Sequence, residues 1–385
     1  MTGGTANGAS AGGDPEDGIP FGDERRQRAA DVVSAALTDR CAAAFVHAGS
    51  DRDPGLRYCV PTPPSGPTAV AYDGTADEWL VRSSADGIGG HPADRLASAL
   101  ADRGLEGTVL TPPRLPHDAA IYLERAGFDL ASTEALERAR ATKTAGERER
   151  IASAQQAAAT GIRRAASLLA ESAVDDGRLA LAEGDGTESV PLTAAHLRTA
   201  IDEAIVGAGG FPAGNTAVDP DSSRNPDEPL RPGEPIVLAT APRDRTGYYG
   251  GLVRTLVVDS DGGRERRVHV AVTQSFRSAR SMLTAGPESV TAVEADLEAE
   301  VRSFGFDTDR TVATEVAGVG LEPRERPFAG GDEVGPGAVV RLDVAGAVDS
   351  DSRIRIADVL VVSDEGERPE WLVAPSQSLS PASSL

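Results

Sequence analysis

Few residues of this chain combine the type and the spacing that catalytic or metal chemistry requires. Its five histidines are His47, His91, His117, His196 and His269, and no His-x-x-x-His or similar pair occurs among them. A divalent metal site needs several anionic oxygens together with imidazole, because the cation exchanges its water shell for ligands of matching charge and number. We interpret His269 as a surface or helix-start residue rather than a ligand, and we expect no relocated metal site.

The most informative stretch is a predicted β-hairpin between Arg231 and Thr255. Its first strand follows a Pro-Gly-Glu turn and ends at Ala239, and its second strand starts near Gly251 and carries Arg254. This outline resembles the pita-bread metallopeptidases, the family of Xaa-Pro aminopeptidase, prolidase and methionine aminopeptidase, with creatinase as a metal-free relative. In that family, the positions matched by Ala239 and Gly251 hold metal-binding aspartates.

The same resemblance extends to the later metal-ligand positions. The stretch 316–327 matches a glycine-rich family motif in which the metal-binding histidine falls on Ala317. The strand that normally ends in a metal-binding glutamate ends here in Asp343, one methylene shorter, and the last glutamate position falls on Ala357. Among the five positions implied by the resemblance, only Asp343 keeps an oxygen donor.

This pattern implies a fold that is kept without its chemistry. One carboxylate cannot hold two cations close together, so the two-metal route to an activated water is closed at these positions. Creatinase uses a general acid–base histidine instead, but the matching loop at 211–224 contains none. We therefore expect an inactive homologue that needs no cofactor and serves as a ligand- or protein-binding module. The alternative is an active Xaa-Pro aminopeptidase, dipeptidase or creatinase-like hydrolase that uses other residues.

Several residues beside the lost ligand positions are candidates for contacts with a small molecule or peptide. Arg254 either binds ligand or is a strand arginine paired with a carboxylate, which we favour. Glu325 is a substrate contact or is retained for structure. Arg324, where the family has a substrate-facing histidine, and Arg326 either recognise a carboxylate or balance charge, which we slightly favour. The candidate contacts are Tyr248, Arg254, Arg324, Glu325 and Asp358.

Composition predicts the environment of the protein. The formal net charge is −22, and Lys143 is the single lysine among 38 basic residues. Such an acidic, arginine-rich surface is typical of a haloarchaeal cytoplasm, where salt screens self-repulsion; the alternative is an acidic protein from a GC-rich genome. The charge disfavours nucleic acid and membrane partners. No transmembrane run or signal peptide is evident, and Cys41 and Cys59 are isolated thiols, so we expect a cytoplasmic location.

The length of 385 residues predicts two domains. We expect a disordered tail at 1–20, an N-terminal α/β domain at 21–138, a pita-bread domain at 139–375 and a second disordered tail at 376–385. The stretch 177–190, rich in Gly, Asp and Glu, is predicted to be an exposed insertion. The family resemblance also implies a homodimer.

Hydrophobic periodicity predicts an α/β (α+β) fold, and the family resemblance implies a smaller creatinase-type α/β domain before the pita-bread domain. Helices are expected at 23–37, 93–103, 118–126, 193–207, 271–283 and 289–304. A further long helix is expected to follow the joining segment 138–151 and to continue through Ala157, Ile162 and Leu169. Strands are expected at 42–47, 68–72, 79–82, 107–111, 235–239, 252–258, 339–344 and 353–362.

Overall fold

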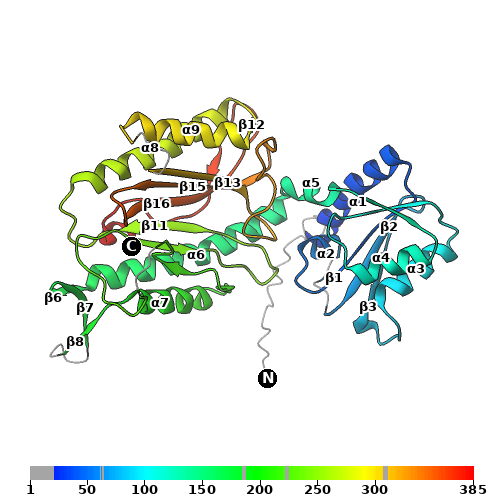
Figure 1. Cartoon of the computed structure of the whole chain (residues 1–385), viewed down its shortest axis with the longest axis horizontal. Helices are drawn as coiled ribbons and strands as arrows, with labels where there is room; N and C mark the ends of the chain where they lie inside the picture. The colour runs from blue at the N-terminus through cyan, green and yellow to red at the C-terminus, as the bar shows by residue number, and fades with distance from the viewer. Residues whose placement is uncertain (1–20, 61, 63–64, 184–187, 222–224, 307–310) are drawn as a thin grey trace, which may run out of the picture.

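The fold is described here from a computed structural model (Figure 1). It describes residues 21–60, 62, 65–183, 188–221, 225–306 and 311–385, and the predicted tail at 1–20 lies outside them. The chain forms two units, one around a five-stranded sheet and one around a seven-stranded sheet. The predicted α/β class and the order of a smaller unit before a larger one are confirmed.

The N-terminal unit is a mixed sheet with helices on both faces. Its strand order is β3-β2-β1-β4-β5, and β1 pairs antiparallel with β2 and parallel with β4. Alternate residues of β1 point into different cores, Phe45 into one and Val46 into the other, because successive side chains of a strand face opposite sides. The elements are α1 (Phe21–Arg40), β1 (Ala44–Gly49), α2 (Pro54–Cys59), β2 (Thr68–Asp73), β3 (Glu78–Ser83), η1 (Ser84–Asp86), α3 (Pro92–Asp102), β4 (Thr108–Thr111), α4 (His117–Arg125), β5 (Asp129–Ser132) and α5 (Ala135–Ala141).

The C-terminal unit is built on a sheet with the strand order β13-β15-β16-β11-β10-β9, to which β17 is added beside β16. Helices α6 and α7 form one packed pair and α8 and α9 another; they lie below and above the strands in Figure 1. The main elements are α6 (Ala145–Glu171), α7 (Ala194–Gly207), β9 (Ala217–Val218), β10 (Ile236–Thr240), β11 (Leu252–Leu256), α8 (Gly263–Ala285), α9 (Val290–Ser303), β13 (Val312–Gly318), β15 (Val339–Ala347), β16 (Arg353–Val361) and β17 (Glu370–Trp371).

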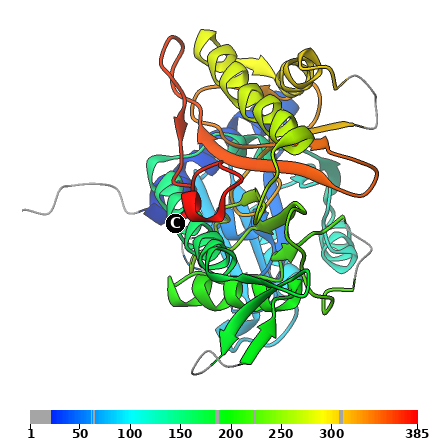
Figure 2. The same ribbon diagram turned by 90° about the vertical axis from the view of Figure 1, so that its left-hand side faces the viewer.

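Both helix pairs cover the same face of this sheet, at different strands: α6 contacts β10 and β11, and α8 contacts β15 and β16. Leu238 and Leu252 pack with α6 and α7, while Leu342 and Ile356 pack with α8 and α9. Figure 2 shows α8 lying across β15 and β16. All four residues are even-numbered positions on their strands, so the odd-numbered positions face the opposite side. We call this opposite side, which carries Ala239, Val253, Glu315, Asp343 and Ala357, the open face.

Small elements decorate the larger unit. The predicted insertion at 177–190 lies mostly in a three-stranded sheet of β6 (Ala173–Asp175), β7 (Arg178–Glu183) and β8 (Glu188–Pro191). Leu179 of β7 is fully buried against the α6–α7 core, so part of this stretch is anchored rather than exposed. A two-stranded sheet pairs β12 (Glu288–Ser289) with β14 (Glu333–Val334), and η2 (Pro381–Ser384) follows near the C-terminus.

The two units share one apolar core. It combines Phe45 and Tyr58 of the first unit with Ile151, Tyr248 and Val339 of the second. Polar contacts reinforce this boundary. Arg25 donates to the carbonyls of Tyr58 (3.1 Å) and Val60 (2.6 Å) and to the Tyr248 hydroxyl (3.4 Å).

Two predictions about the C-terminal unit differ from the structure. Helix α8 begins at Gly263 rather than 271, so His269 lies inside the helix, where Nε2 pairs with the Gln377 carbonyl oxygen at 2.5 Å. The apolar periodicity starts only at Val268, and the charged turns before it gave no helix signal. The segment 376–385 is not a disordered tail: the Val257 amide donates to the Leu379 carbonyl at 2.8 Å, and Ser384 is fully buried.

Within the described ranges, no helix is both long and apolar enough to span a membrane.

Candidate ligand-binding cleft

The strand registers bring the five predicted metal-ligand positions together on the open face. Ala239 pairs with Val253, Val253 with Ala357, Ala357 with Asp343, and Asp343 with Glu315. These pairs form a row across five strands. Gly251 and Ala317 stand two residues from Val253 and Glu315, so they share the face.

One end of this row is apolar. Val237, Val253 and Ala357 form a small buried cluster, and Ala239 packs against it. Ala357 is fully buried. Side chains of this kind offer no lone pair, so this part of the open face cannot bind a cation.

The other end of the row is an ion-pair network around Asp343. Its two carboxylate oxygens accept from Nε and Nη2 of Arg355 at 2.8 Å each, the paired geometry that arginine and carboxylate favour. Arg341 lies 3.6 Å from the same carboxylate. The hydrogen bond with Asp343 raises the pKa of Arg355 above its ordinary value. Asp343 is buried, and each of its two carboxylate oxygens accepts a hydrogen bond from Arg355.

Arg341 crosses the open face toward the first lost aspartate pair. A Cβ atom at Gly251 would lie 3.4 Å from the Arg341 Cδ atom and 3.6 Å from Nη1. Arg341 also donates to Glu315 at 3.3 Å, and Arg324 donates to the other oxygen of Glu315 at 2.7 Å. Acidic and basic groups therefore alternate along this edge, from Arg324 through Glu315, Arg341 and Asp343.

The residues present do not fit a dinuclear metal centre. Such a site needs several carboxylates and an imidazole with free lone pairs, whereas the carboxylate of Asp343 is already bound by arginine. Two positive guanidinium groups beside it would also repel a cation. In the part of the chain that the structure describes, no group of three or more His, Cys, Asp or Glu side chains is placed to hold a metal ion.

A cavity of about 450 Å³ lies beside this network, between the two units. Arg324 and Glu325 line it from the second unit, and His47 and Asp53 line it from the first. Arg324 is half exposed at this cavity and pairs with Glu315 of the open face. It therefore connects the two regions, and we call the cavity and the open face together the cleft.

Glu325 is a fixed structural anion of the cavity wall. It is buried and forms ion pairs with Lys143 at 2.8 Å and with Arg140. Burial alone would raise the pKa of Glu325, but Arg140 and Lys143 outweigh it and lower the pKa below 4.5. A Cβ atom on Gly320 would lie 2.1 Å from the Glu325 carboxylate, so the glycine makes room for it. The structure supports the structural alternative for Glu325.

His47 and Asp53 form a pair that sequence reasoning missed. His47 Nε2 lies 2.7 Å from Asp53 Oδ1, and the same oxygen accepts from the Leu56 amide at 2.7 Å at the start of α2. Burial would raise the pKa of Asp53, but the hydrogen bond and charge of His47 lower it. The available signal was an N-cap aspartate before Pro54, six residues after a strand histidine.

Three predicted ligand contacts lie away from the cleft. Tyr248 is fully buried between the units, and its hydroxyl donates to Glu147 at 3.0 Å. Arg254 and Asp358 lie on the helix-covered face, joined by a 2.6 Å ion pair. The prediction that these residues contact a ligand in the cleft is corrected, because strand alternation and packing turn them away. The favoured alternative, a strand arginine paired with a carboxylate, is confirmed for Arg254.

The family model of metallopeptidase family M24 matches residues 149–364. The chain belongs to metallopeptidase family M24. Among curated proteins, none matches the chain. The M24 assignment covers the whole of the open face and both helix pairs, and it confirms the pita-bread resemblance predicted from the hairpin and the later ligand positions.

Solved structures share the fold of this M24 chain at low sequence identity. The dipeptidase from Pyrococcus horikoshii superimposes with a TM-score of 0.72 at 17% identity, covering 92% of this chain and 99% of that one. The prolidase from Pyrococcus furiosus gives 0.69 at 15%, covering 89% and 99%. The N-terminal domain of FACT complex subunit SPT16 from chickpea gives 0.67 at 13%, covering 93% and 98%. At such identities, the likeness establishes the fold alone.

Proposed function

We propose that this M24 homologue binds short peptides in its cleft without hydrolysing them. The observation that carries the proposal is the environment of Asp343, whose carboxylate is held by Arg355 on both oxygens with Arg341 beside it. This carboxylate is the only oxygen donor among the five expected metal-ligand positions, and it is engaged by cations of the chain itself.

Peptides are the ligand class that the site and its relatives favour together. Two structural relatives are named a dipeptidase and a prolidase. The cavity of about 450 Å³ falls in the size range of small-ligand pockets. Arg324 at its edge offers a guanidinium to a peptide carboxylate, and the exposed Phe328 ring at the same cavity offers an apolar surface for a side chain.

Hydrolysis and binding are tested separately. Xaa-Pro dipeptides incubated with the protein and Mn²⁺ should show background hydrolysis, because the residues that the structure describes include no group of side chains able to hold the metal ion that would position a hydroxide. Turnover that survives repurification and disappears in Asp343→Ala would overturn the non-hydrolytic proposal. Asp343 is the right probe, because it is the one retained donor.

Binding of the dipeptide Ala-Pro is measured by isothermal titration calorimetry. We expect saturable heats that weaken at least about tenfold in Arg324→Gln and persist in Arg267→Gln, an exposed arginine of α8 outside the cleft. Absence of saturable binding in the wild-type protein would show that peptides are not the ligand.

A protein-binding role is the second candidate. Phe328 is exposed at the cavity, with Arg324 4.8 Å and Arg326 5.9 Å from its ring centroid, and arginine–aromatic groupings are common at protein interfaces. One structural relative is the N-terminal domain of a complex subunit. A protein partner retained by the wild type but lost in Phe328→Ser would favour this role over peptide binding.

We also propose that the protein is a cytoplasmic homodimer from a halophile. The acidic composition supports the halophilic origin, and the M24 family resemblance supports the dimer. Light scattering after size exclusion in KCl should give twice the chain mass of 39.7 kDa. A mass of one chain at micromolar concentration would exclude a stable dimer.

A further inference from the structure

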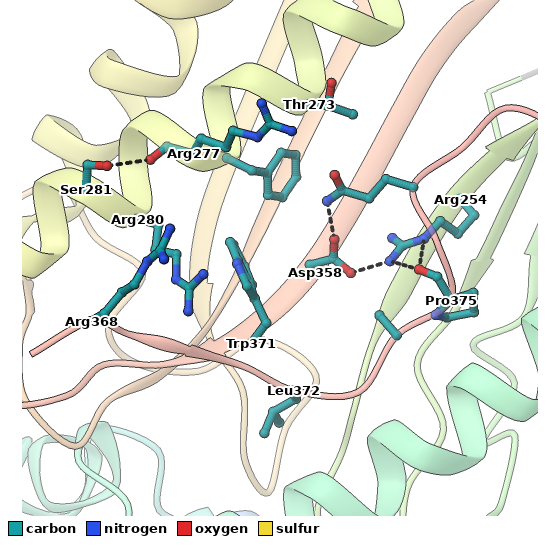
Figure 3. A pocket seen from close by; sticks show the side chains of 13 residues that line it. Arg254, Thr273, Arg277, Arg280, Ser281, Asp358, Arg368, Trp371, Leu372 and Pro375 are labelled. Carbon is teal, nitrogen blue, oxygen red and sulfur yellow. Dashed lines mark hydrogen bonds and ion pairs between the residues drawn. The ribbon is translucent and has the colours of Figure 1, made fainter. Parts of the chain in front are cut away.

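A second cavity lies on the helix-covered face of the C-terminal sheet, away from the cleft. It has a volume of about 400 Å³ and is bounded by α8 and by the segment 368–377 around β17 (Figure 3). The helix contributes residues from 273 to 281 at spacings of three and four, which place them on one face. The floor comes from β11 and β16 through Arg254 and Asp358.

The charged groups on the floor of this cavity, Arg254 and Asp358, pair with each other. Asp358 accepts from Arg254 at one oxygen and from Gln377 at the other, both at 2.6 Å. Arg254 also donates to the carbonyls of Pro375 and Ala357. Asp358 is the only acidic residue among the described residues that line the cavity. Its charge is balanced by its ion pair with Arg254.

The walls carry arginines without such partners. Arg277, Arg280 and Arg368 line the cavity, and no carboxylate in the described ranges forms an ion pair with any of them; Glu367 and Glu370, their neighbours in sequence, are exposed and do not line it. The chain has 60 acidic and 38 basic residues, yet among the described residues only Asp358 brings a carboxylate to this cavity.

Arg280 is the best-placed of the three. Its Nε donates to the Pro369 carbonyl at 2.7 Å, which fixes the guanidinium, and in the described part of the chain its two Nη groups find no protein acceptor. Burial lowers the pKa of Arg280, and the nearby charge of Arg368 lowers it further. Two guanidinium groups held close together repel each other, so an anion between them would relieve the repulsion.

An aromatic surface completes the cavity. The Trp371 ring lies 5.9 Å from Phe276, centroid to centroid, and the guanidinium of Arg280 stands 5.9 Å from the centroid of the Trp371 ring. Figure 3 shows Arg280 and Arg368 together beside this indole, while Asp358 and Arg254 lie on its other side. The cavity thus offers cationic hydrogen-bond donors next to a flat apolar surface.

We infer that this cavity is an anion-binding site for a small phosphate monoester, held by Arg280 and Arg368 with its organic part against Trp371. Arginine binds phosphate through paired N–H donors with matching geometry. A volume of about 400 Å³ suits a ligand of mononucleotide size. The site is separate from the cleft and does not depend on what the cleft binds.

Fluorescence titration of the full chain tests the inference. The chain has two tryptophans, so Trp79→Phe leaves Trp371 as the only indole and places the signal in the cavity. Adenosine 5′-monophosphate, inorganic phosphate and adenosine are titrated in KCl. We expect saturable change with the monophosphate, competition by inorganic phosphate, and no binding of uncharged adenosine.

Matched variants identify the residues. Arg280→Gln and Arg368→Gln should each weaken monophosphate binding at least about tenfold, while Arg267→Gln, an exposed arginine of the same helix outside the cavity, should leave it unchanged. Arg368 is exposed, so its replacement tests binding without disturbing the core. Absence of a saturable signal with either anion, equal affinity for adenosine, or undiminished binding in both variants would overturn the inference.

Discussion

The Cδ atom of Arg341 lies 3.4 Å from the point that a Cβ atom on Gly251 would occupy. A side chain at position 251 would therefore start in van der Waals contact with Arg341. Where the family resemblance places a metal-binding aspartate, the chain has a glycine, and the space beside it is taken by a guanidinium tethered two residues before Asp343. The missing carboxylate at Gly251 and the position of the Arg341 guanidinium are therefore two parts of the same local arrangement.

Restoring the ligands alone should give only weak metal binding. Arg341 and Arg355 would still repel Mn²⁺ and hold the carboxylate at position 343. Replacing both with alanine in the restored background should strengthen Mn²⁺ binding at least about tenfold, as measured by calorimetry. The restored positions are Ala239→Asp, Gly251→Asp, Ala317→His, Asp343→Glu and Ala357→Glu.

The control for this experiment is the double arginine replacement in the otherwise natural chain, which should not gain Mn²⁺ affinity. If the folded variant with all seven changes binds no Mn²⁺, the assignment of the five positions is wrong.

Gly320→Ala should destabilise the protein by about 2–4 kcal/mol. The added Cβ atom would lie 2.1 Å from Glu325 Oε1, and moving that carboxylate would break its contacts with Arg140 and Lys143. Gly331→Ala is the matched control, because a Cβ atom there meets nothing within 4 Å. Urea unfolding of both variants measures the difference, and equal midpoints would show that Glu325 yields freely.

The protein should lose stability in acid as Glu325 becomes protonated. Its pKa is lowered in the folded state, so its contribution to stability is present above the unfolded value near 4.5 and is lost as the pH falls through the folded value. Glu325→Gln should reduce this acid dependence while costing about 3–5 kcal/mol at pH 7, because Arg140 and Lys143 lose their shared anion. Unfolding free energies between pH 3 and pH 7 would test both effects, and an unchanged slope would contradict the assignment.

Glu147 should show the opposite pH dependence of stability to Glu325. Burial raises its pKa in the folded state, so the charged form costs stability as the pH rises from 4.5 through the folded value. In Glu147→Gln, the side-chain oxygen can still accept from the Thr144 amide, and the side-chain NH2 can donate to the Tyr248 hydroxyl oxygen in place of the present bond. This variant should abolish the loss and leave stability at pH 7 equal or higher. A large loss of stability at pH 7 would show that the charge itself is required.

Stability should rise with salt. A chain with a net charge of −22 repels itself, and screening shortens from about 10 Å at 0.1 M to below about 3 Å beyond 1 M salt. Thermal midpoints measured from about 0.1 to about 3 M KCl should increase steadily. Midpoints that stay flat over this range would argue against a halophilic origin.

The family resemblance grouped the five expected ligand positions at one site, and strand alternation explains why they share one face of the sheet. Ala239, Gly251, Ala317, Asp343 and Ala357 come from separate strands, yet all lie on that face. Residues two apart on a strand point to the same face. Arg341 and Arg355 each lie two residues before an expected ligand position, so their place on the open face was also predictable. The prediction of lost metal ligands rested on the residues at the five expected positions and left out the two arginines beside them.

Other features depended on contacts distant in sequence. The sequence favoured a carboxylate partner for Arg254 but did not identify Asp358, 104 residues further along the chain, as that partner. The Ser-rich segment at 376–385 has the composition of a loose tail, but backbone bonds to Val257 and the side chain of Asp358 hold it in place. Tyr248 resembled a cleft residue because its motif borders the hairpin, whereas the first unit covers it.

The shared apolar core has a consequence for motion. Phe45 and Tyr58 of the first unit pack in one cluster with Ile151 and Val339 of the second, so opening a hinge between the units would expose this buried surface to water. The walls of the interdomain cavity are therefore preorganised, and a ligand that fits them loses little affinity to domain closure. The proposed peptide would therefore enter a cavity whose walls are already in place, without movement of the two units toward each other.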